Sequence, residues 1–175
     1  MGKRAKIEQI YRDHYAFVWR ILRRLGAPAV DDAVQEVFVV MHSRWQEFDL
    51  SNGARPLLYG IARKVAAQQR RKHERQPPAL ALVRDAMVDP EENSARAEAA
   101  RVIEATLERM DERKRMAFVL VDIEGMSVPE VARCQRINLN TAYARLRAAR
   151  QSIQQSVRRH RAREESDHVR ARAPR

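Results

Sequence analysis

Residues 127–150 read SVPEVARCQRINLNTAYARLRAAR, and this stretch decides the fold of the C-terminal half of the chain. Ser127 and Glu130 have the spacing of a capping box, in which each side chain bonds the backbone amide of the other residue. Pro129 between them fits the first turn of a helix. Asn138 is a second capping residue, because its side-chain oxygen can accept from an amide at a helix start. A short helix, a turn and a longer helix are therefore predicted, which is the helix-turn-helix pattern.

The longer helix has an apolar face and a basic face. Its apolar positions, three and four residues apart, are Leu139, Ala142, Leu146, Ala149, Ile153 and Val157. The other face carries amide, hydroxyl, aromatic and guanidinium groups, which suit base edges and phosphates in a DNA major groove. Its members are Asn140, Thr141, Tyr143, Ala144, Arg145, Arg147 and Arg150. A basic face that is only solvated explains the charge as well, but the two capping signals ahead of it favour DNA recognition.

Apolar residues at helical spacing predict three helices in the N-terminal half. The first covers about 7–25 and is ended by Gly26 and Pro28. The second runs from Asp31 to Trp45, and the third begins near Pro56 and ends in a run of basic residues. Further helices are predicted at 94–109 and 111–124, the latter capped by Asp111.

Composition defines the class of the protein. The chain has 175 residues, with 34 Lys and Arg against 23 Asp and Glu, and a formal net charge of +11. This length excludes a large catalytic barrel, and no nucleophile-base grouping or metal-ligand spacing is present, so we expect no catalysis, cofactor or metal site. The basic balance indicates a polyanionic partner. The lone Cys134, interpreted as a small buried residue, and the short apolar runs favour a cytoplasmic protein that does not enter the membrane.

The expected fold is all-α, with two small helical domains joined by a flexible linker. The first domain covers residues 1–76, and the linker, which has one Arg against four acidic residues, covers 77–95. The second domain, containing the helix-turn-helix, covers 96–157. The basic tail at 158–175 has almost no large apolar residues, so we expect it to be disordered.

Four blocks of the sequence together resemble one protein family. The blocks DDAVQEVF at 31–38 and ARPLLYGIARK at 54–64 resemble the first conserved domain of the extracytoplasmic-function sigma factors of bacterial RNA polymerase. The blocks EGMSVPEVA at 124–132 and NTAYARLRAAR at 140–150 resemble the second conserved domain of that family. The order and spacing agree over about residues 7–157.

The resemblance implies binding to core RNA polymerase and to promoter DNA. The polymerase site would be the clamp helices of the largest subunit, contacted by Asp32, Gln35, Glu36 and Val39. The downstream promoter element would be melted and bound by the loop and third helix of the first domain. The residues assigned to it are Asp49, Ser51, Asn52, Arg55, Tyr59, Arg63, Lys64, Arg70 and Arg71. The helix-turn-helix would read the upstream element as duplex, and the family implies an anti-sigma partner.

The sequence departs from the usual family pattern at a few positions. Leu57 and Lys64 stand where Trp and Asn are common, and the loss of an aromatic residue removes a packing anchor or wedge. Gln135 and Arg136 replace the common Leu-Gly of the helix-turn-helix. An arginine at a turn that needs positive φ would cost about 1 kcal/mol.

Two other classes of protein remain open on the residues alone. A conventional helix-turn-helix repressor or activator would use its N-terminal helices for dimerisation or ligand sensing and would bind a palindrome without polymerase. A basic adaptor for a membrane surface or RNA would need only the cations near Arg70 and those of the tail.

Overall fold

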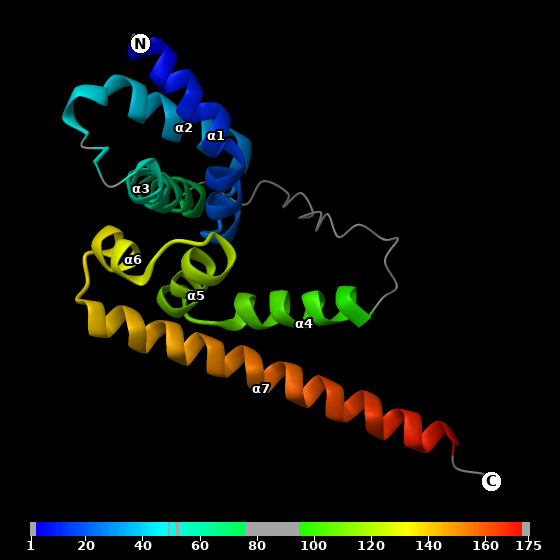
Figure 1. Cartoon of the computed structure of the whole chain (residues 1–175). Coiled ribbons are helices and arrows are strands. Elements are labelled where there is room, and N and C mark those ends of the chain that lie inside the picture. Colours follow the sequence, from blue (N-terminus) through cyan, green and yellow to red (C-terminus); the bar gives the residue numbers. More distant parts are fainter. Residues whose placement is uncertain (1–2, 49, 52, 76–94, 173–175) are drawn as a thin grey trace.

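The structure is a computed structural model that describes residues 3–48, 50–51, 53–75 and 95–172 (Figure 1). All regular secondary structure in these residues is helical, which confirms the all-α prediction.

The first helical unit contains α1 (Lys3–Arg24), α2 (Val30–Ser43), the 3-10 turn η1 (Trp45–Glu47) and α3 (Ala54–Glu74). Gly26 follows α1 with a φ of 71°, a conformation that glycine adopts without strain. Asp31 and Asp32 lie in the first turn of α2, where negative charge is favourable. The indole N–H of Trp19 also donates to Asp31 at 3.1 Å, so this residue joins α1 to α2.

The three long helices of this unit pack pairwise through their apolar faces. The largest fully buried side chains of the unit are Val18, Ile21, Leu22, Leu25, Val34, Val37, Met41 and Leu58. Each such side chain contributes about 1.5–3 kcal/mol when it is removed from water.

The second helical unit contains α4 (Ala95–Arg109), α5 (Glu112–Phe118), the π-helical turn η2 (Val119–Ile123), α6 (Val128–Gln135) and α7 (Leu139–Arg172). Figure 1 shows α7 passing α6, α5 and α4 in turn, and it packs against all three.

The predicted capping residues hold the ends of these helices. The Asp111 carboxylate accepts from the backbone N–H groups of Arg113 and Lys114. Ser127 and Glu130 form the complete capping box, with the Ser127 N–H donating to the Glu130 carboxylate at 2.7 Å. The Asn138 side chain accepts from the N–H at position 141 at 2.7 Å. The helix-turn-helix is therefore built as its sequence predicted.

The helix predicted at about 111–124 is found as α5 followed without a break by the π-helical turn η2, which ends at Ile123. The prediction for the tail differs from the structure. The tail at 158–175, expected to be disordered, continues α7 as far as Arg172. No Gly or Pro interrupts 139–172, and Arg, Ala, Glu and Gln propagate a helix readily once packing has nucleated it.

The two units share one continuous core. Met116, Val119, Leu120, Met126 and Val131 of the second unit belong to the same buried cluster as the core of the first. The helix α6 also packs against α3. Within the predicted linker at 77–95, only position 95 is among the described residues, and it begins α4.

The capping box makes a testable contribution to stability. We expect Ser127→Ala to lower the free energy of unfolding by about 1 kcal/mol, because an amide at the start of α6 loses its partner. Chemical denaturation of the full chain measures this. The matched control is Ser43→Ala near the end of α2, where the hydroxyl donates only to the Val40 carbonyl. Equal effects of the two changes would contradict a specific role for the cap.

Candidate nucleic-acid and polymerase interfaces

The start of α7 carries an open surface. Four of the residues predicted to contact upstream DNA are exposed there, namely Asn140, Tyr143, Ala144 and Arg147. Thr141 is half-buried beside them. Leu139, which was assigned to the packed face, is 43% exposed, because the buried stripe of α7 begins only at Ala142. Amide, aromatic and cationic groups are thus available together on one helix end.

Two other predicted upstream residues are engaged within the protein. Arg150 forms a bidentate pair with Asp122 of η2, at 2.9 and 2.6 Å, and this hydrogen bonding raises the pKa of Arg150. Arg145 is half-buried and donates to the Gln135 side chain at 3.1 Å. Both were expected on the DNA-facing surface, and Arg150 is exposed there while it pairs with Asp122.

A basic groove runs along α3. It is lined by Arg63, Lys64, Arg70, Arg71, Lys72 and Arg75, with Glu112 of α5 at one side. Successive cations along one helix suit the phosphates of a nucleic-acid strand. Of the loop residues predicted to hold a base, Ser51 is exposed, whereas Asp49 and Asn52 lie outside the described residues.

Tyr59 is not available to DNA in this arrangement. It is only 3% exposed, and burial raises the pKa of its hydroxyl to about 12. The side chain lies beside Gln135 and Arg145 of the second unit. The predicted contact with the downstream element is therefore blocked by the packing of α6 on α3.

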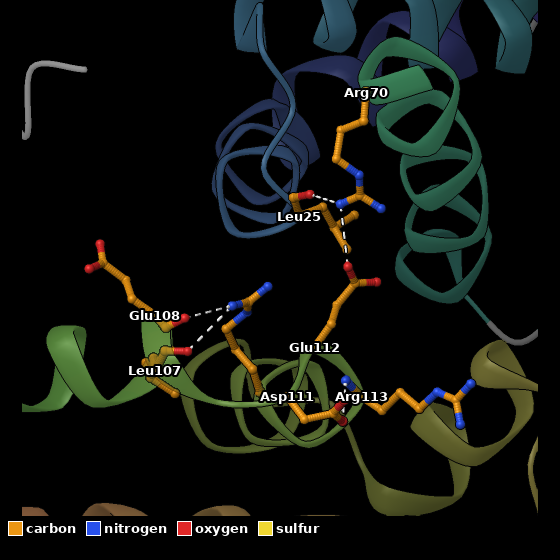
Figure 2. A network of polar contacts seen from close by, with 8 residues as sticks. Leu25, Arg70, Leu107, Glu108, Asp111, Glu112 and Arg113 are labelled. Atoms are coloured by element: carbon orange, nitrogen blue, oxygen red, sulfur yellow. Dashed lines mark hydrogen bonds and ion pairs between the residues drawn. The ribbon is translucent and has the colours of Figure 1, made fainter. Parts of the chain in front are cut away.

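Arg55 and Arg70 join the two units. The Arg55 guanidinium donates to the backbone carbonyl of Glu124 at 2.6 Å and lies 5.6 Å from the centre of the Phe17 ring. Figure 2 shows Arg70 reaching from α3 to the Leu25 carbonyl at the end of α1 and to Glu112 of α5, 3.3 Å away. Both arginines were predicted to bind DNA, and both are occupied by protein here.

An ion pair with a buried carboxylate joins the two units. Glu124 is only 6% exposed, and Arg20 of α1 donates to both of its carboxylate oxygens at 2.7 Å. The hydrogen bond to this carboxylate raises the pKa of Arg20. Arg24 and Glu104, 2.7 Å apart, form a second pair between the units. Sequence reasoning missed Glu124, although a carboxylate following the apolar run of η2 was a signal that it needs a partner.

The proposed polymerase face of α2 is largely open. Asp32, Gln35 and Val39 are exposed, and Val39 keeps 65% of its surface accessible. Glu36 instead is half-buried and accepts from Gln69 of α3 at 3.4 Å. Three of the four predicted residues therefore lie on one exposed face of α2, whereas Glu36 bonds the neighbouring helix α3.

Other candidate features are limited within the described chain. No group of three or more His, Cys, Asp and Glu side chains there could hold a metal ion. None of the described helices is long and apolar enough to span a membrane. Cys134 is half-buried, and burial raises the pKa of its thiol to about 12, so the reactive thiolate is suppressed.

Comparison with known proteins identifies the class. Residues 10–76 match the family described as Sigma-70 region 2, and residues 100–153 match the family described as Sigma-70, region 4. The two matches follow one another and together cover more than half of the chain. The chain therefore belongs to the sigma-70 family, the promoter-specificity subunits of bacterial RNA polymerase.

Individual relatives indicate which type of sigma factor the chain is. The ECF RNA polymerase sigma factor SigM of Mycobacterium tuberculosis is 24% identical over 151 residues, which cover 85% of this chain and 76% of SigM. The solved structure of the sigma factor RpoE in complex with the anti-sigma factor NepR from Bartonella quintana has the same fold, with a TM-score of 0.67 and 16% identity over 87% of this chain and 97% of that one. The structure of CnrH in complex with the cytosolic domain of CnrY gives a TM-score of 0.63 and 26% identity over 87% of this chain and 88% of that one. The chain is an extracytoplasmic-function (ECF) sigma factor.

The ion pair between the units can be tested directly. We expect Glu124→Gln to weaken the contact by about 1–3 kcal/mol, because the charge-assisted bonds to Arg20 are lost. Small-angle X-ray scattering of the full chain should then report a larger radius of gyration. Glu8→Gln is the control, since Glu8 forms an exposed ion pair with Arg12 inside α1. Unchanged scattering for Glu124→Gln would show that the apolar contacts alone hold the units together.

Proposed function

We propose that this ECF sigma factor joins core RNA polymerase through α2, binds the downstream promoter element through α3 and reads the upstream element through α7. One observation carries the proposal: a separate cationic surface lies in each matched region, on α3 in region 2 and on α7 in region 4. One protein can then hold two promoter elements at once. Polymerisation itself belongs to the polymerase, and we expect the sigma subunit to act in the cytoplasm without catalytic groups of its own.

The α2 face supports a protein partner better than DNA. Asp32 offers a carboxylate, Gln35 an amide and Val39 an exposed apolar contact. Carboxylates and amides pair with arginine, and a central apolar contact is typical of protein interfaces. The clamp helices of the largest polymerase subunit are the proposed partner.

The α3 groove and the α7 surface are proposed to bind different parts of the promoter DNA. Arg63, Lys64 and Arg71 contribute cations without base selectivity, which suits the phosphates of the non-template strand. Asn140, Tyr143 and Arg147 are the residues proposed to lie in the major groove of the upstream element.

Some of the residues assigned to the downstream element would become available only when the two units separate. Arg55 and Arg70, which the proposal places on DNA, are held by Glu124 and Glu112 in the described arrangement. Tyr59 is buried beside Gln135 and Arg145 of the second unit. We therefore propose that this closed arrangement is inactive. The solved complex of RpoE with the anti-sigma factor NepR supports an anti-sigma partner for this chain.

The decisive experiment is transcription with purified components. The full chain added to core RNA polymerase should start transcripts at discrete sites on genomic fragments, whereas core polymerase alone should not. A chain that binds a palindromic duplex tightly but never stimulates core polymerase would favour the helix-turn-helix repressor.

The α2 face gives a prediction for polymerase binding. We expect Gln35→Ala combined with Val39→Ala to reduce association with core polymerase by at least about tenfold, because a polar contact and an apolar contact are both lost. A pull-down with titrated core enzyme measures this. Glu108→Ala, an exposed change on α4, is the control and should bind normally. Loss of binding in both variants would indicate a general defect, and loss in neither would exclude the α2 face.

The two DNA surfaces should respond differently to the loss of an arginine. We expect Arg147→Ala to weaken upstream-element binding by about 1–3 kcal/mol and to relax its sequence preference. Arg71→Ala should weaken binding alike on all sequences and lower the salt slope by about 1. Binding of holoenzyme to matched and scrambled promoters distinguishes these results. An equal loss on all sequences for Arg147→Ala would assign that residue to the DNA backbone.

A further inference from the structure

The turn of the helix-turn-helix contains a strained residue. Arg136 follows α6 with φ 54° and ψ 50°, the left-handed conformation. Within the described residues, every other position with positive φ is a glycine, namely Gly26, Gly53 and Gly125. An arginine adopts this conformation less readily than glycine, because its Cβ approaches the following carbonyl.

The backbone bonding explains why the left-handed conformation is needed. The Ile137 N–H donates to the Ala132 carbonyl and the Arg136 N–H to the Arg133 carbonyl, each at 3.0 Å. These are the paired bonds of a Schellman motif, which closes the end of a helix and usually has glycine at the position of Arg136. The fold therefore requires the conformation, but it does not require arginine.

The side chain of Arg136 contributes nothing visible to the fold. It is exposed and forms no hydrogen bond or ion pair with any described residue. A strained residue without an internal partner is best explained by a partner outside the protein.

We propose that Arg136 binds a backbone phosphate of the upstream promoter DNA and fixes how α7 enters the major groove. The inference rests on the proposed function, in which α7 reads duplex DNA. Arg136 lies two residues before the Asn138 cap, and the exposed Asn140 follows on the first turn of α7. A cation at the turn is placed for the phosphates that border the groove, and phosphate contacts set the register in which base-reading side chains act. The guanidinium also suits the bidentate geometry of phosphate.

The proposal predicts opposite effects of one substitution on stability and on DNA binding. We expect Arg136→Gly to lower the unfolding equilibrium constant of the full chain about fivefold, because the strain is relieved. The same change should weaken binding of the holoenzyme to DNA about five- to tenfold and reduce the slope of log K against log salt by about 1. The probe is a fluorescent duplex that wild-type holoenzyme selects from a random-sequence library.

Three further variants isolate the charge. Arg136→Asn, which tolerates the left-handed conformation without a charge, should reproduce the DNA defect even if the glycine variant folds poorly. Arg136→Lys keeps the charge and should bind DNA within about threefold of wild type with the wild-type salt slope. Arg109→Ala removes an exposed cation of α4 and should change neither measurement.

The outcomes separate the proposal from its alternatives. If the Arg136→Gly and Arg136→Asn proteins bind the duplex with wild-type affinity and salt slope, the proposed phosphate contact is contradicted. The proposed function is not contradicted by that result. If a variant assembles more weakly with core polymerase but binds DNA with unchanged affinity, Arg136 contacts a protein partner, and the proposed phosphate contact is contradicted as well. If wild-type holoenzyme selects no duplex, the proposed function fails and the phosphate contact fails with it.

Discussion

Glu124 carries a carboxylate that is almost completely removed from water, and such a group is stable only when cations and hydrogen bonds replace its hydration. Arg20 supplies two hydrogen bonds to the carboxylate, and Arg55 binds the backbone carbonyl of the same residue. Because Glu124 lies between η2 and α6, these bonds hold the helix-turn-helix against α1 and α3. The burial of Tyr59 and the position of Arg145 depend on this arrangement.

The sequence was sufficient for local structure but not for the contact between the units. The capping box, the Asn138 cap and the left-handed turn depend on residues within five positions of one another, so their spacing is visible in the chain. The bond between Arg20 and Glu124 joins residues 104 positions apart, and nothing in the spacing relates them. Tyr59 and Arg145 were therefore placed on free surfaces, whereas Tyr59 is buried by the packing of α6 on α3 and Arg145 is half-buried beside it.

The C-terminal extension shows a different limit of sequence reasoning. Residues 158–175 cannot form a core, and composition therefore suggested disorder. Composition does not report whether a helix already exists next to the segment. The packed part of α7 provides that nucleus, and adding residues to an existing helix costs far less than starting one. The helix consequently reaches Arg172.

The closed arrangement also constrains how the protein could be activated. Asp32, Gln35 and Val39 are already exposed while Glu124 is buried. A partner that contacted only this face would bind the closed and open arrangements equally. A ligand with equal affinity for two states does not shift the equilibrium between them. Opening must therefore come from contacts that exist only when the units separate. The surfaces released by that separation include Arg55 and Arg70, whose bonds to Glu124 and Glu112 would be exchanged for bonds to phosphate. If the units separate as proposed, the free energy of the contact between them is subtracted from the affinity for DNA, and a polymerase that held the units apart would supply that free energy.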